Sequence, residues 1–179
     1  MATAPEVLIQ RGYEARRDHR PADAKELFCE AVALCREADD RVRLAQALTG
    51  VGQIERDLNE VDGARQHYEE AVAIYRTLDD PLGLAYTVRH VGDILRGQGE
   101  RDVAEPCYAE ALGIYRKHEA TSLLDLANAI RGYALLKGDG GETAGAAALW
   151  REAKELYAAV DVQAGVVESE RQLVSLTQR

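Results

Sequence analysis

The sequence predicts an all-α protein built from a repeated pair of helices. A block of thirteen residues recurs at a spacing of forty residues, at Ala24–Arg36, Ala64–Arg76 and Ala104–Arg116, and again less completely at Ala146–Tyr157. Within each block the apolar residues recur at i, i+3, i+4 and i+7, which is one face of a helix with 3.6 residues per turn. Only four prolines occur in 179 residues, so long stretches are free to be helical.

A second recurring element precedes each of these blocks. It is seen at Leu44–Gly52, Leu84–Gly92 and Leu126–Ala134, with a weaker copy from Val7 to Gly12. We name this element helix A and the later block helix B. A helix pair this short cannot bury its apolar stripe alone, so stacked neighbouring pairs must bury it.

The residues between the elements are typical of helix ends. Asn59, Gly99 and Gly141 lie between A and B, and Asn and Gly are the residues that best tolerate a left-handed turn. Between B and the next A lie residues that we expect to be N-caps, followed in one case by Pro81 at the first helical position. These expected N-cap residues are Asp39-Asp40, Asp79-Asp80, Thr121-Ser122 and Asp161.

These boundaries predict four antiparallel helix hairpins and a ninth helix. The hairpins fall at about 5–40, 41–80, 81–120 and 122–160, and the ninth helix at 162–177. We expect a single domain over residues 1–179. Small residues of helix A allow close approach of helix B, and a large aromatic of helix B fills the space between them. The small residues are Gly52, Gly92 and Ala134, and the aromatics are Phe28, Tyr68, Tyr108 and Trp150.

These residues resemble the tetratricopeptide repeat. Its pattern of a large apolar residue, an apolar-Gly pair, Ala, an aromatic and Ala is matched by Leu48, Val51-Gly52, Ala64, Tyr68 and Ala71, and matched again forty residues later. The period of about forty is similar to that of the longer subclass found in kinesin light chains and bacterial regulators. The resemblance implies a right-handed α-α superhelix, or solenoid, of four hairpins, with a C-terminal capping helix and a concave groove lined by helices A.

By this resemblance, two rows of groove-facing positions contain six arginines and no acid. The rows are Ile9, Thr49, Arg89, Arg131, Arg171 and Arg16, Arg56, Arg96, Gly138. Tyr13 and Gln53 lie between the rows, and Tyr86 and Asn128 lie towards the helix starts. We therefore predict a partner-binding site made of the six arginines together with Tyr13, Gln53, Tyr86 and Asn128.

Guanidinium groups bind carboxylates through paired hydrogen bonds, so the rows suggest an acidic peptide or helix as ligand. The alternative is that the arginines pair with internal acids or are simply solvated. The internal acids available are Asp57, Asp93, Asp139 and Glu168.

We expect a non-catalytic protein–protein interaction scaffold that uses no cofactor and no metal. The alternatives are a small acidic chaperone or regulatory subunit for one client protein, and an enzyme-associated regulatory domain. No Ser/His/Asp or Cys/His arrangement recurs at matched positions, and the four histidines fall in different repeats without ligand spacing.

The net charge of −9 argues against a nucleic-acid partner, and no apolar run is long enough for a membrane helix. The N-terminus lacks the apolar core of a signal peptide, and Cys29, Cys35 and Cys107 fit reduced thiols, so we expect a cytoplasmic protein. A monomer is favoured, with the ninth helix as a cap. A homodimer through Val167 and Val174 on that helix is the alternative.

Overall fold

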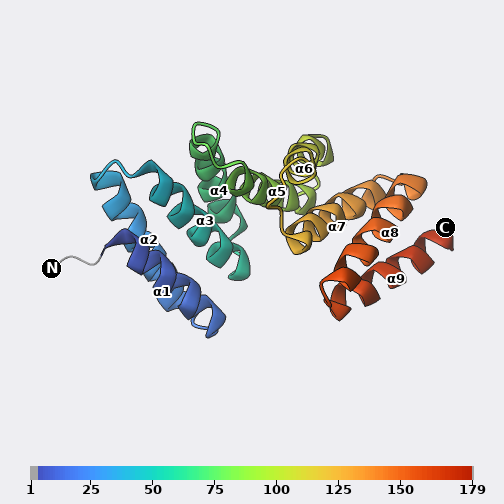
Figure 1. The fold of residues 1–179 in the computed structure, drawn as a ribbon, viewed down its shortest axis with the longest axis horizontal. Coiled ribbons are helices and arrows are strands. Elements are labelled where there is room, and N and C mark those ends of the chain that lie inside the picture. Colours follow the sequence, from blue (N-terminus) through green and yellow to red (C-terminus); the bar gives the residue numbers. More distant parts are fainter. Residues whose placement is uncertain (1–3, 179) are drawn as a thin grey trace. The chain divides into compact units, whose positions relative to one another are not determined.

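The computed structural model describes residues 4–178, and every regular element within them is an α-helix. The helices are α1 (Pro5–Arg17), α2 (Pro21–Glu37), α3 (Arg41–Asp57), α4 (Val61–Tyr75), α5 (Pro81–Gly97), α6 (Arg101–Tyr115), α7 (Leu123–Asp139), α8 (Thr143–Ala159) and α9 (Gln163–Thr177) (Figure 1). The predicted all-α fold is therefore confirmed. No described helix is both long enough and apolar enough to cross a membrane.

The helices form two compact units, the first ending at Thr87 and the second beginning at Val88, so that the boundary lies within α5. In the first unit α1 packs on α2 and α3, α2 packs on α3, and α3 packs on α4. In the second unit α6 packs on α7, α7 on α8 and α8 on α9, and Figure 1 shows the last of these pairs side by side. A single domain over 1–179 stays a prediction.

The turns after helices A have the predicted left-handed residues. Asn59, Gly99 and Gly141 have φ angles of 63°, 81° and 78°. After Asn59, the Glu60 N–H donates to the Glu55 carbonyl at 2.7 Å, while the Asn59 N–H donates to the Arg56 carbonyl at 3.0 Å. This pair of bonds satisfies carbonyls that the end of a helix leaves without partners.

The N-caps were predicted correctly at three turns. The side chain of Asp40 accepts a hydrogen bond from the Arg43 N–H at 3.0 Å, and Asp80 and Ser122 accept the equivalent bonds three residues on. Pro81 is the first residue of α5, as expected.

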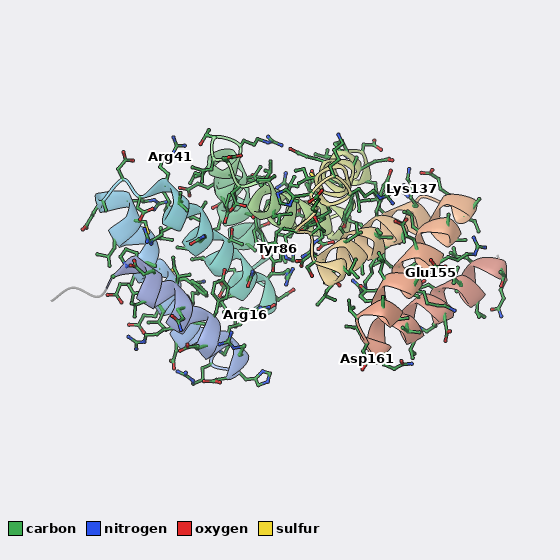
Figure 2. All side chains as sticks on the ribbon, in the orientation of Figure 1. Arg16, Arg41, Tyr86, Lys137, Glu155 and Asp161 are labelled. Carbon is green, nitrogen blue, oxygen red and sulfur yellow. The ribbon has the colours of Figure 1, made fainter. Side chains whose placement is uncertain are left out.

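The N-cap prediction was wrong for Asp39 and Asp161. Both have positive φ angles, 52° and 56°, so each closes the preceding helix in the left-handed conformation instead of capping the next one. Figure 2 shows Asp161 at the turn between α8 and α9. The N-cap position of α9 is Val162, which makes no side-chain cap. Asp is among the few side chains that tolerate a left-handed position, so composition alone does not separate the two roles.

The core of each hairpin is the contact between an aromatic ring of helix B and a small residue of helix A. Phe28, Tyr68, Tyr108 and Trp150 are all buried, with at most 1% of each exposed. A Cβ atom placed on Gly52 would lie 3.1 Å from the Tyr68 ring, and one on Gly50 would lie 2.4 Å from the Phe28 ring. Glycine is therefore required where the rings approach the helix backbone.

Two alanine substitutions test this requirement. Gly50→Ala should lower the free energy of unfolding by about 1 kcal/mol or more, because overpacking outweighs the gain in helix propensity. Gly113→Ala is the matched control, since that helical glycine has no neighbour within 4 Å of the added Cβ. It should raise the stability by about 0.5–1 kcal/mol. Urea unfolding followed by circular dichroism measures both, and equal midpoints for the two variants would contradict the packing argument.

Candidate functional site

The predicted site residues fall into two sets, one in each unit. The first unit holds Tyr13 and Arg16 on α1, Gln53 and Arg56 on α3, and Tyr86 on α5; Arg16 and Tyr86 are labelled in Figure 2. The second unit holds Arg89 and Arg96 on α5, Asn128 and Arg131 on α7, and Arg171 on α9.

In the first unit, the aromatic and amide side chains are held by hydrogen bonding and ring packing. Gln53 is 4% exposed, and its Nε2 donates to the Tyr86 hydroxyl at 2.8 Å. The Tyr13 ring meets the Phe28 ring edge-on, with centroids 4.9 Å apart. Burial, followed by the neighbouring Tyr86 and Tyr75, raises the pKa of Tyr13 above its usual value, so its hydroxyl stays protonated.

The two arginines of the first unit share one carboxylate. Arg16 Nε donates to Asp57 Oδ2 at 2.8 Å, and Arg56 Nη2 lies 3.7 Å from the other oxygen of Asp57. The Arg16 and Asp57 side chains are 36% and 38% exposed. Because both groups are partly solvated, this pair contributes about 0–1 kcal/mol.

In the second unit, Asp93 is the centre of a polar cluster. Its carboxylate accepts hydrogen bonds from Arg89 Nη1 at 2.9 Å and from the Tyr108 hydroxyl at 2.7 Å. Arg89 also donates to His90 Nε2 at 2.7 Å. This bond leaves the His90 proton on Nδ1, which lies 3.4 Å from Asp93. Arg89 is only 7% exposed, so it belongs to this interior cluster more than to a solvent-facing row.

The protonation of Asp93 reflects opposing effects. Burial by itself would raise the pKa of its carboxyl group. The hydrogen bond from His90, the charge of Arg89 and the hydrogen bond from Tyr108 together outweigh burial and lower the pKa to about 2. Asp93 is therefore ionised across the physiological range.

Two further arginines of the second unit also have internal carboxylate partners. Arg131 forms a two-pronged pair with Glu168, with N–O distances of 2.7 and 2.8 Å, and Arg96 donates to Asp139 at 3.0 Å. Asn128 accepts a hydrogen bond from the Tyr157 hydroxyl at 2.8 Å. Arg171 is exposed and makes no ion pair with any residue from 4 to 178.

All four acids that the sequence offered as alternative partners pair with an arginine of the rows. The pairs are Arg16–Asp57, Arg89–Asp93, Arg96–Asp139 and Arg131–Glu168. An acidic ligand for these arginines stays a prediction. The pairing adds a condition to it, because such a ligand has to replace an internal carboxylate.

The sequence did not predict a second polar cluster, between α2, α3 and α4. The Glu55 side chain is 7% exposed and lies 2.7 Å from His67 Nδ1 and 3.2 Å from Lys25 Nζ. The one available signal for this cluster in the sequence was that Glu55 occupies a position of the repeat that holds the apolar residue Leu95 in α5. Among residues 4–178, no group of three or more His, Cys, Asp or Glu side chains is arranged to hold a metal ion.

Comparison with known proteins identifies a family for the first part of the chain. Residues 5–77 match the tetratricopeptide repeat. This stretch belongs to the tetratricopeptide repeat family. The internal sequence repeat carries the same helix hairpin beyond residue 77, through α5 and α6 to α7 and α8. No curated protein sequence matches the chain.

Two solved structures share this tetratricopeptide-type fold. The crystal structure of BtubC (BKLC) from P. vanneervenii is 20% identical, with a TM-score of 0.76, over 89% of this chain and 67% of that one. The crystal structure of aspartyl phosphate phosphatase F from Bacillus subtilis is 15% identical, with a TM-score of 0.80, over 94% of this chain and 44% of that one. This chain thus spans less than half the length of the phosphatase. Identities this low establish the shared fold alone.

The pKa of Asp93 makes a prediction about acid stability. The folded pKa of about 2 is below the ordinary aspartate value of 3.8, so the contribution of Asp93 to stability is present above pH 4 and is lost as the pH falls towards 2. Asp93→Asn should lower the free energy of unfolding by roughly 2 kcal/mol at pH 7 and by much less at pH 2. Urea midpoints at both pH values measure this difference. Glu26→Gln, at an exposed position of α2 beyond its first turn, is the control and should change neither midpoint. A deficit of Asp93→Asn that does not shrink in acid would contradict the assignment.

Proposed function

We propose that this chain is a non-catalytic scaffold that binds a peptide or helix of a partner protein on the faces of its A helices. Tetratricopeptide repeats are generally non-catalytic modules of protein–protein interaction. The observation that carries the proposal for this chain is the Arg131–Glu168 pair. Two hydrogen bonds to Glu168 fix the orientation of the Arg131 guanidinium, while 40% of the Arg131 side chain remains exposed.

A partner segment with acidic side chains is the ligand that this arrangement favours. The internal carboxylate orients the guanidinium, so little conformational entropy is lost when a second carboxylate takes its place. A partly exposed ion pair contributes about 0–1 kcal/mol, so breaking the internal pair costs little free energy. Arg16, held by Asp57 in the first unit, offers the same exchange.

The polar side chains beside these arginines support binding of a main chain as well as of acids. Asn128 is an amide on an A helix, is partly exposed, and is held in place by the Tyr157 hydroxyl. Amide and hydroxyl groups both donate and accept hydrogen bonds, which are the interactions that an extended peptide or the end of a helix requires.

We further propose that the protein works in the cytoplasm. Cys29, Cys35 and Cys107 are free thiols, and burial raises the pKa of the Cys35 thiol, which keeps it protonated. Free thiols of this kind suit a reducing compartment.

Removal of an internal acid distinguishes the exchange from a simple solvated pair. Glu168→Gln frees Arg131 and should tighten binding of an acidic peptide by up to about fivefold, since the lost pair contributes at most about 1 kcal/mol. Asp57→Asn should act likewise through Arg16, and Arg131→Gln should weaken binding. The probes are a fluorescent peptide pool rich in Asp and Glu and the same pool with Asn and Gln, followed by fluorescence polarisation.

The control for these variants lies on helices B. Arg116, the C-cap residue of α6, donates from Nη2 to both carboxylate oxygens of Glu152 of α8, at 2.9 and 2.8 Å, and both groups are exposed. Glu152→Gln should leave binding of both pools unchanged. If it tightens binding as much as Glu168→Gln does, the effect is one of net charge and the A-helix site is disproved.

A further inference from the structure

An exposed apolar stripe runs along α9. Val167 and Val174 are 55% and 57% exposed, and their spacing of seven residues puts them on one side of the helix. Gly165, Ser169 and Leu176 are buried on the opposite side, and α9 packs on α8. A shallow depression beside Val167 is lined also by Gln163, Ala164, Glu168 and Arg171. The stripe is therefore the outward face of this helix.

In the other A helices, the positions equivalent to Val174 face helix B. These positions hold Gly52, Gly92 and Ala134. A Cβ atom on Gly52 would lie 3.1 Å from the Tyr68 ring, and one on Gly92 would lie 3.3 Å from the Tyr108 ring. The added methyl groups of a valine leave no room for such a ring. The outward face of α9 carries two exposed valines, and it does not fit the glycine–aromatic contact of a hairpin.

The position equivalent to Val167 shows the same change. Its counterparts Ala45, Ala85 and Ala127 are completely buried. Valine at both positions makes this face bulkier than its counterparts. Side-chain ridges of one helix pack into the grooves of another with 8–10 Å between the helix axes. The face therefore suits a helix of similar character.

The charged residues between the two valines indicate which helix packs on this face. Glu170 and Arg171 are adjacent and exposed. If two α9 helices pack antiparallel about a twofold axis between these residues, Val167 lies opposite Val174 of the partner subunit and Glu170 lies opposite Arg171 of the partner subunit. The two ends match as well, with Gln163 opposite Gln178 of the partner subunit. A parallel pair would instead bring like charges together, which is unfavourable.

We propose that α9 is a self-association surface on which two copies of this chain pack antiparallel. Arg171 has no ion pair among residues 4–178 and is available for the contact. Glu170 lies 3.2 Å from Lys154, and both side chains are exposed, so that pair is readily exchanged. The sequence favoured a monomer, but the exposure of both valines favours its stated alternative, the homodimer. Glu168, the partner of Arg131 in the proposed ligand site, borders this surface, whereas Val174 and Glu170 take no part in that site.

The dimer should be weak and reversible. A helix of 15 residues is about 22 Å long, and a single pair of such helices buries less than the roughly 1,200 Å² of a stable interface. Sedimentation equilibrium over about 10–500 µM protein is the measurement suited to interfaces of that size. The average mass should rise with concentration from 19.6 kDa towards twice that value.

Three variants test the valine stripe. Val167→Glu and Val174→Glu should each remain monomeric over the whole concentration range. Val103→Glu is the matched control, because Val103 is 53% exposed on α6, and it should associate as the unmodified chain does. A monomeric mass for the unmodified chain at every concentration overturns the proposal, as does association that the α9 variants leave unchanged.

Charge exchange tests the antiparallel register. Glu170→Arg alone and Arg171→Glu alone should each abolish association, because each places like charges opposite one another. An equimolar mixture of these two variants should associate again, since every Arg then faces a Glu. Circular dichroism shows whether each variant is folded. Failure of the mixture to associate, with both variants folded, overturns the antiparallel pairing, and peptide binding by the monomeric variants reports separately on the proposed function.

Discussion

The distance between helix A and helix B is set by an aromatic ring that lies directly on a glycine. Phe28 fills the space above Gly12 and Gly50, and Tyr68 fills the space above Gly52. The rings are buried, so each hairpin packs one large aromatic side chain against a small counterpart. This contact fixes which face of each A helix is covered and hence which face remains for other purposes.

The remaining face of the A helices is polar, and its charges are balanced internally. Four arginines of the predicted rows have a carboxylate within 3.0 Å. The pairs differ in burial, and burial determines what each can do. The pair at Asp93 is part of an interior network that stabilises the fold, whereas Arg131 and Arg16 remain partly solvated.

The acidic net charge of −9 is compatible with such a site. Carboxylates that pair with four of the six row arginines supply part of that charge. Attraction between exposed charges is screened by salt over about 10 Å, so these pairs act locally.

The outward face of α9 departs from the rule that governs the other helices. Where the rule places glycine or alanine, α9 has two valines with an acid and a base between them. The same comparison of equivalent positions that identifies the hairpins thus identifies a face that cannot serve in a hairpin. Repetition gives each position an expected residue, so a departure carries information that a non-repeating fold would not provide.

The sequence by itself determined the helices and most of their ends, because these depend on local rules. The left-handed turns at Asn59 and Gly99 and the caps at Asp40 and Asp80 follow from residues within a few positions of one another. The role of Asp39 escaped prediction because the adjacent Asp40 satisfies the same local signal, and that of Asp161 because Asp suits both an N-cap and a left-handed position.

Only the tertiary structure decided what the arginines contact. The sequence named both the arginines and the acids, but Arg131 and Glu168 lie 37 positions apart, and Arg16 and Asp57 lie 41 apart. Helical periodicity gives the face on which a side chain lies, not the reach of a long flexible side chain to a neighbouring helix. Burial likewise depends on what packs above a face, which is why Arg89 is interior and Arg171 is exposed although they occupy equivalent positions of the repeat.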